Sequence, residues 1–96
     1  MFLKSSYTTL SGLAVPNAVI RIPGVGITHT DESGEQDPDN FYLGIQFDVF
    51  ASEDSAIKIE SGFVTKIYER SDVSIIEAAY DILKDNPKFS DSVLVP

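Results

Sequence analysis

The clearest periodic pattern in the chain runs from Phe41 to Ala51. Its odd positions are apolar and its even positions are mostly polar or glycine. Successive side chains of a β-strand point to opposite faces of the sheet, so this alternation predicts a strand with one buried face. Tyr42, Asp48 and Phe50 fall on the other face, away from the predicted core.

A second strand is predicted before this one. Ala18–Ile22 is rich in β-branched residues, and the extended pattern resumes from Val25 to Thr30. Pro23 cannot donate to a ladder and Gly24 permits a bend, so we expect a bulge or kink between the two parts.

A third extended run spans Gly62 to Arg70 and follows a turn-like segment at Ser52–Ser55. Within it, Tyr68 is out of phase with Phe63 and Ile67, so we group Tyr68 with the aromatic residues that lie outside the main core. Three strands with short connections favour an antiparallel meander.

The apolar period changes to that of a helix after Val73. Ser74 to Glu77 matches a capping box, and apolar residues recur on one helical face as far as Leu83. Asn86-Pro87 is expected to end the helix, with Phe89 packed on the core beyond it. The predicted fold is α+β: a single domain, residues 1–96, with a small antiparallel sheet of three to four strands and one C-terminal helix packed on one face.

The segment 31–40 is an acidic hairpin loop between the first two predicted strands. Its acids are Asp31, Glu32, Glu35, Asp37 and Asp39. An EF-hand loop needs glycine at its sixth position and glutamate at its twelfth, but counting from Asp31 the glycine is fourth and the twelfth residue is Tyr42. A hard cation could still be chelated weakly, but the spacing favours a loop kept solvated by its charge, with no specific metal.

Candidate catalytic chemistry is sparse. His29 is the single histidine and lies two residues before Asp31, yet no nucleophile motif accompanies the pair, so a structural role is expected. Gly24-Val25-Gly26 lacks the third glycine of a dinucleotide fingerprint. Asp48 is expected to pair with Arg21 or Lys66 on a neighbouring strand. We therefore expect no enzyme activity, no catalytic residues and no cofactor.

The composition suits a small globular domain. The 96 residues are 43% hydrophobic and contain no cysteine, which excludes disulfides and thiolate metal sites. No apolar run is long enough for a signal peptide or a membrane span, so we expect a soluble protein, made in the cytoplasm, without a membrane partner.

The net charge of −8 argues against binding to nucleic acid, which requires basic residues that neutralise phosphates. Between Ile22 and Ile57 there are eight acids and no lysine or arginine, while the rest of the chain has seven of each sign. The whole net charge therefore belongs to one segment.

One helix can cover only one face of a sheet, so aromatic residues on the second face imply a partner. That partner is most simply another protein or another copy, although exposed aromatics are also tolerated without one. The predicted interaction residues are Tyr42, Asp48, Phe50 and Tyr68, with Val93, Leu94 and Val95 in the apolar-tipped tail 90–96. The tail is expected to add a strand to a neighbour's sheet edge.

Residues 47–56 (FDVFASEDSA) resemble a group of small proteins from tailed-phage genomes. The order of elements is similar over about residues 18–95, including the Pro-x-Phe that follows the helix. The resemblance implies a non-enzymatic virion protein, often encoded near tail or fibre genes, and it transfers no catalytic residues. The acidic loop is longer than the group leads us to expect.

The leading hypothesis is a virion structural protein, made in the host cytoplasm, that acts as a tail adaptor or a baseplate or fibre-attachment component. Its partners would be other virion proteins or copies of itself. A close alternative is a capsid cement or neck protein. An alternative of another class is an acidic inhibitor that mimics nucleic acid and occupies the binding groove of a host protein.

Overall fold

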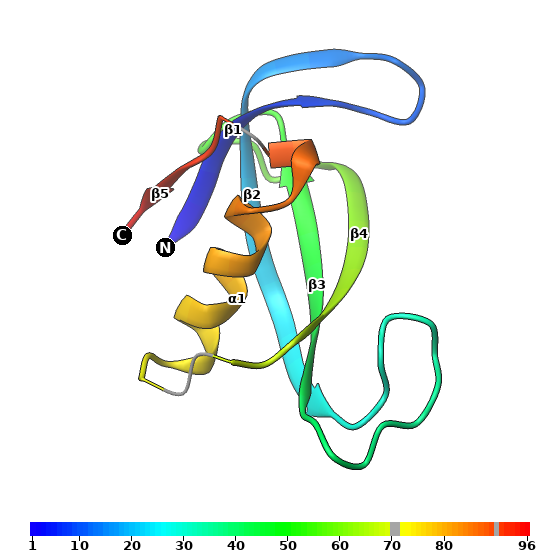
Figure 1. Ribbon diagram of the computed structural model, residues 1–96. Helices are drawn as coiled ribbons and strands as arrows, with labels where there is room; N and C mark the ends of the chain where they lie inside the picture. The colour runs from blue at the N-terminus through cyan, green and yellow to red at the C-terminus, as the bar shows by residue number, and fades with distance from the viewer. Residues whose placement is uncertain (70–71, 90) are drawn as a thin grey trace.

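The computed structural model describes residues 1–69, 72–89 and 91–96. Arg70, at the end of the third predicted strand, and Ser90, at the start of the predicted tail, lie outside the described residues. The described residues form a five-stranded sheet with the order β4-β3-β2-β1-β5, in which every neighbouring pair is antiparallel (Figure 1). The elements are β1 (Phe2–Thr8), β2 (Ala14–Thr28), β3 (Tyr42–Phe50), β4 (Lys58–Ile67), α1 (Ile75–Lys84), the 3-10 turn η1 (Pro87–Phe89) and β5 (Val93–Val95).

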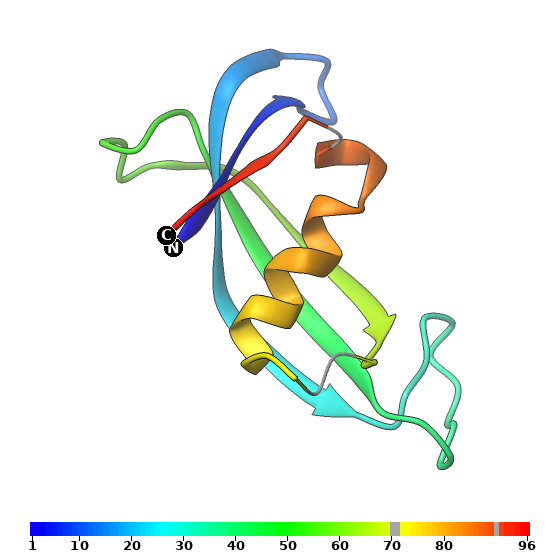
Figure 2. The same cartoon turned by 60° about the vertical axis from the view of Figure 1, so that its left-hand side comes forward.

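The predicted α+β fold is confirmed, with an antiparallel sheet and one helix near the C-terminus. The sheet has five strands rather than three to four, because β1 and β5 were not expected. In β1 the inward positions are Leu3, Ser5 and Tyr7. The serine interrupts the apolar alternation that would have predicted the strand. The N- and C-termini lie side by side because β5 pairs with β1 (Figure 2).

The core lies between the sheet and α1. Leu3, Ala18, Ile20, Leu43, Ile45, Phe47 and Val49 of the sheet meet Ala78, Ala79, Tyr80, Leu83 and Phe89. Phe89 is fully buried, as predicted, and its ring stacks on Tyr7 at 5.7 Å and meets the edge of Phe47 at 5.4 Å. The short turn η1 therefore closes one end of the core with three aromatic rings.

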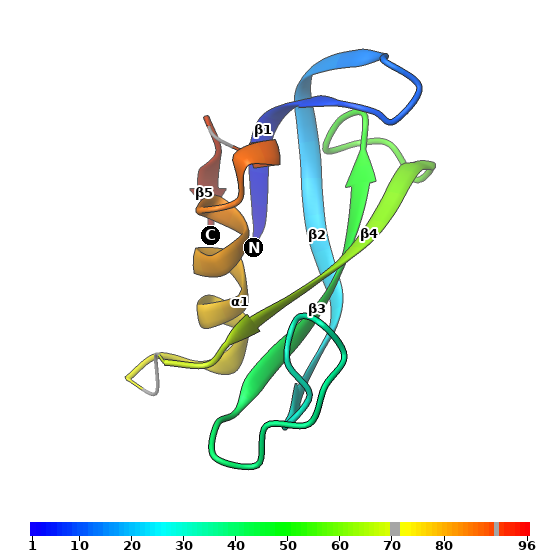
Figure 3. The ribbon, with the colours of Figure 1, turned by 45° about the vertical axis from the view of Figure 1, so that its right-hand side comes forward.

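The helix begins and ends where the sequence predicts. The Ser74 hydroxyl accepts a hydrogen bond from the Glu77 amide at 3.2 Å, and the last helical residue is Lys84. α1 packs against β2 and β1 on one face of the sheet (Figure 3). No helix of the described chain is long and apolar enough to cross a membrane.

The bulge predicted at Pro23 is confirmed, since the register of β2 against β3 shifts between Arg21 and Gly24. At this point the Ile22 amide donates to the Tyr80 hydroxyl at 3.2 Å, and that hydroxyl donates to the Met1 carbonyl at 3.0 Å. One buried side chain of α1 thus holds the bulge and the start of β1 together.

We expect Tyr80→Phe to lower the free energy of unfolding by about 1–3 kcal/mol, because the Ile22 amide and the Met1 carbonyl lose a partner. Urea denaturation of the purified protein measures this change. Tyr68→Phe is the matched control and should have a smaller effect, since the Tyr68 hydroxyl bridges no two backbone groups among the described residues. Equal losses for the two variants would contradict the assignment.

Candidate functional site

The acidic loop connects β2 to β3 as a hairpin and is held by its own carboxylates (Figure 1). Asp31 accepts hydrogen bonds from the Ser33 hydroxyl at 2.7 Å, the Ser33 amide at 2.9 Å and the Glu35 amide at 3.0 Å. The Ser33 side chain and then the Glu35 amide hold the pKa of Asp31 below its ordinary value. Its charge therefore stabilises the turn that contains it.

Asp37 makes a second set of bonds near the other end of the loop. It accepts from the Tyr42 hydroxyl at 2.7 Å and from the Asn40 side-chain amide at 3.0 Å. The Tyr42 hydroxyl holds the pKa of Asp37 below its ordinary value, and the same bond raises the pKa of Tyr42 to about 12. Tyr42, predicted to contact a partner, is therefore engaged in closing the loop.

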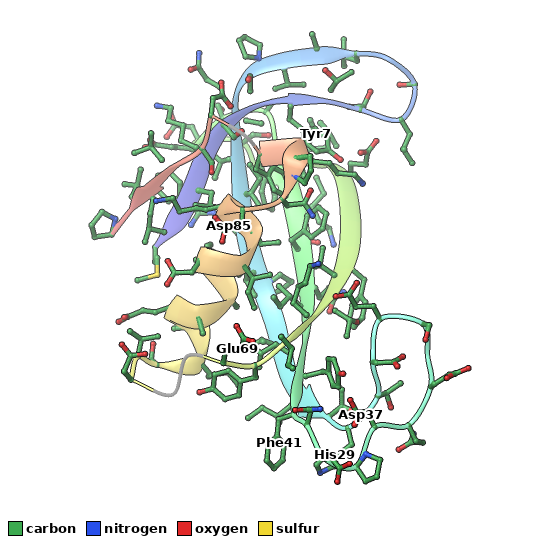
Figure 4. All side chains as sticks on the ribbon, viewed as in Figure 1. Tyr7, His29, Asp37, Phe41, Glu69 and Asp85 are labelled. Atoms are coloured by element: carbon green, nitrogen blue, oxygen red, sulfur yellow. The ribbon has the colours of Figure 1, made fainter. Side chains whose placement is uncertain are left out.

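His29 lies at the base of this loop with Phe41 and Asp37 (Figure 4). Its Nδ1 lies 2.8 Å from the Asn40 carbonyl oxygen, and its ring packs on Phe41 with centroids 4.6 Å apart. These contacts use the histidine to join the two strand ends. Within residues 1–69, 72–89 and 91–96, no three His, Cys, Asp or Glu side chains are placed to hold a metal ion together.

The expected pairing of Asp48 with Arg21 or Lys66 is wrong. Asp48 Oδ1 instead accepts from the Ser61 hydroxyl at 2.9 Å and lies 3.8 Å from the Lys58 ammonium nitrogen. Arg21 is opposite Asp48 in the register, but its guanidinium lies over the Phe2 ring, 4.9 Å from the centroid. Lys66 pairs with Glu32 of the acidic loop at 3.2 Å. The Phe2 ring is therefore the partner of Arg21, and the Glu32 carboxylate is the partner of Lys66.

The face that α1 leaves uncovered is called here the open face of the sheet. Phe50 lies on it and is half-buried. The phase expected for the third strand is reversed: Phe63 and Ile67 lie on the open face, while Tyr68 packs, partly buried, against the core. Phe63 is 67% exposed and lies so close over Gly44 that a Cβ there would come within 2.9 Å of the ring. Glycine at position 44 thus lets the phenylalanine lie flat on the sheet.

The apolar tail forms an edge strand of its own sheet. Val93, Leu94 and Val95 pair with Lys4, Leu3 and Phe2 respectively. Asp91 fastens the segment, since it accepts from the Ser6 hydroxyl at 2.6 Å and from the Ser5 hydroxyl at 2.9 Å, and these bonds lower its pKa. β1 thus provides one partner for this strand within the chain, and the expected pairing with a neighbour's sheet stays a prediction.

The β1–β2 hairpin is a surface that the sequence pattern did not indicate. Its tip carries Leu10 and Leu13, which are 90% and 60% exposed, and it projects beyond the sheet (Figure 1). Glu60 of β4 anchors it by accepting from the Tyr7 hydroxyl and, at 2.9 Å, from the Leu10 amide. Burial and then Glu60 raise the pKa of Tyr7 to about 12. A contact between residues so far apart in the chain leaves no sequence signal.

Two open grooves flank the core. One, of about 630 Å³, lies between the β1–β2 hairpin and η1, with Tyr7, Val15 and Pro87 among its walls. The other, of about 360 Å³, lies between the end of β4 and the C-terminal end of α1, where Glu69 and Asp85 face it (Figure 4).

Comparison of the chain with protein-family models, with curated proteins and with solved structures finds no match. The resemblance to small phage proteins consequently stays a prediction.

The carboxylates of the loop lead to a pH prediction. A lowered pKa in the folded loop means that the stabilising bonds are complete above the ordinary aspartate pKa of about 3.9 and are lost as the pH falls through the lowered value. Carboxyl-carbon NMR titration should give midpoints below the ordinary value for both Asp31 and Asp37.

Two single variants test which bonds cause these shifts. Tyr42→Phe should raise the titration midpoint of Asp37 and leave that of Asp31 nearly unchanged. Ser33→Ala should raise the midpoint of Asp31 and leave that of Asp37 nearly unchanged. Ordinary midpoints in the unaltered protein would contradict the hydrogen-bonded loop.

Proposed function

We propose that the protein is a non-enzymatic structural component of a tailed-phage virion, which joins neighbouring tail proteins through apolar contacts. The setting rests on the resemblance of residues 18–95 to small phage proteins. The tail adaptor, baseplate or fibre-attachment position is preferred, and the capsid cement or neck position remains the close alternative.

The observation that carries the proposal is the projecting β1–β2 hairpin. Leu10 and Leu13 are exposed at its tip, although full burial of each leucine side chain would contribute about 1.5–3 kcal/mol of favourable free energy. Tyr7 and the Leu10 amide both bind Glu60, so the tip is held in place by β4. A fixed apolar projection suits a contact that is repeated around a symmetric particle, where weak contacts add together.

The acidic mimic of nucleic acid has less support from the geometry. A mimic needs carboxylates that face outward over an extended surface. Here Asp31 and Asp37 bind groups inside their own loop, and Glu32 pairs with Lys66. These contacts favour a structural role for part of the loop's charge.

The proposal predicts that the protein is present in purified virions and that Leu10→Ser/Leu13→Ser reduces its incorporation about tenfold or more. Each tenfold corresponds to about 1.4 kcal/mol, which is less than the burial of one leucine provides. Quantitative mass spectrometry of particles assembled with each variant measures the incorporation.

Ile57→Ser is the matched control, since Ile57 is 75% exposed in the β3–β4 connection, away from the hairpin tip. It should incorporate normally. Absence of the unaltered protein from particles would overturn the virion assignment, and normal incorporation of the leucine variant would overturn the role of the hairpin.

A further inference from the structure

β4 is an edge strand of ten residues, and its outer side is free in the described part of the chain. It pairs with β3 on one side only, because it stands at the end of the strand order. The opposite edge of the sheet is the short strand β5, of three residues. A long unpaired edge is a template for another strand, and soluble proteins usually cover or shorten such an edge.

The direction of the β4 amides follows from one hydrogen bond. The Tyr68 amide donates to the Phe41 carbonyl at 2.8 Å, so at position 68 the backbone faces β3. The register is continuous from Glu60 to Ile67, and backbone groups alternate in direction along a strand. The even positions therefore bond to β3, and Ser61, Phe63, Thr65 and Ile67 present their amides and carbonyls to the free edge.

We infer that this free edge pairs antiparallel with the same edge of a second copy, on a twofold axis at Phe63. The pairing joins two five-stranded sheets into one continuous sheet. The inference concerns the isolated protein and does not depend on the virion role proposed above.

The sequence of β4 is complementary to itself in this register. Phe63 stands opposite Phe63 of the second copy, so two exposed rings meet on the open face. Ser61 stands opposite Thr65, which places hydroxyl against hydroxyl. Glu60 stands opposite Lys66 on the side of the sheet that carries α1, and the twofold axis repeats this pair of opposite charges.

Neighbouring registers lose the match of charges. If one strand slides by two residues in one direction, Lys66 stands opposite Lys58 and Glu60 stands opposite Val64. If it slides by two residues in the other direction, Lys66 stands opposite Gly62 and Glu60 stands opposite Tyr68. Of these three registers, only the one centred on Phe63 pairs acid with base, and like charges directly opposite are destabilising.

The side chains that this register uses keep spare bonding capacity. Glu60 accepts from Tyr7 and Leu10, and a carboxylate has about four acceptor sites. Lys66 pairs with Glu32 at 3.2 Å, and an ammonium has three donors. Phe63 already lies flat on Gly44, so its exposed ring needs no new backbone conformation to meet its counterpart. The surface is therefore formed before the second copy binds.

Charge exchange between the two positions tests the register. Glu60→Lys alone and Lys66→Glu alone each place like charges opposite in both pairs, so each variant should dimerise at least tenfold more weakly than the unaltered protein. An equal mixture of the two variants restores both pairs and should dimerise as the unaltered protein does. Sedimentation equilibrium over a concentration series measures all four samples.

Lys84→Glu is the control, because it changes the net charge by the same amount as Lys66→Glu but belongs to α1 and not to β4. It should leave dimerisation unchanged. A mixture that stays as weak as its components would overturn the register, and an unaltered protein that stays monomeric at millimolar concentration would overturn the dimer.

A cross-link tests the pairing if Glu60→Lys fails to fold after losing its bond to Tyr7. The chain has no cysteine, so Phe63→Cys introduces a single thiol at the axis. Mild oxidation should convert most of this variant to covalent dimer, and far less of the exposed control Ile57→Cys. Equal cross-linking of the two variants would overturn the placement of the axis.

Discussion

The arrangement of the molecule depends on one short helix that must cover a wider sheet. α1 has ten residues and is fixed by Tyr80, whose hydroxyl joins the bulge at Ile22 to the Met1 carbonyl. This bond places the helix over β2 and β1, where it buries the main core. β4 stands at the end of the strand order and keeps a free edge, and Phe63 stays exposed on the face opposite α1.

The acidic loop and the exposed leucines of the β1–β2 hairpin lie in different parts of the fold. The negative segment lies mainly in the β2–β3 connection. There Asp31 and Asp37 accept hydrogen bonds from amides and hydroxyls of the loop and of Tyr42. Leu10 and Leu13 at the hairpin tip and Phe63 on β4 are exposed away from this loop, whereas Ile27 and Phe41 are exposed at its base. The loop is therefore a charged projection held by its own hydrogen bonds, while the exposed apolar side chains of the hairpin and of β4 are those that would gain free energy on burial.

The alternation at Phe41–Ala51, the bulge at Pro23 and the serine cap of α1 could be predicted because each is a local pattern with a local physical cause. β1 could not, since Ser5 occupies an inward position and its hydroxyl is satisfied by Asp91, which is distant in the chain. The face of the sheet on which each β4 side chain lies could not be predicted either. Glu60 faces inward because Tyr7 and the Leu10 amide bind it there, which turns Phe63 outward. The pairing expected for Asp48 was wrong, because Ser61 and Lys58 of β4 are its partners in the folded chain.

The central claim is that β4 has an unpaired edge that a second copy can complete. Amide hydrogen exchange, followed by NMR at two protein concentrations, tests it most directly. The account predicts that Gly62, Val64 and Lys66 are protected at both concentrations through β3. Ser61, Phe63 and Thr65 should exchange rapidly when dilute and become protected when concentrated. Rapid exchange of these three amides at millimolar concentration would contradict the claim.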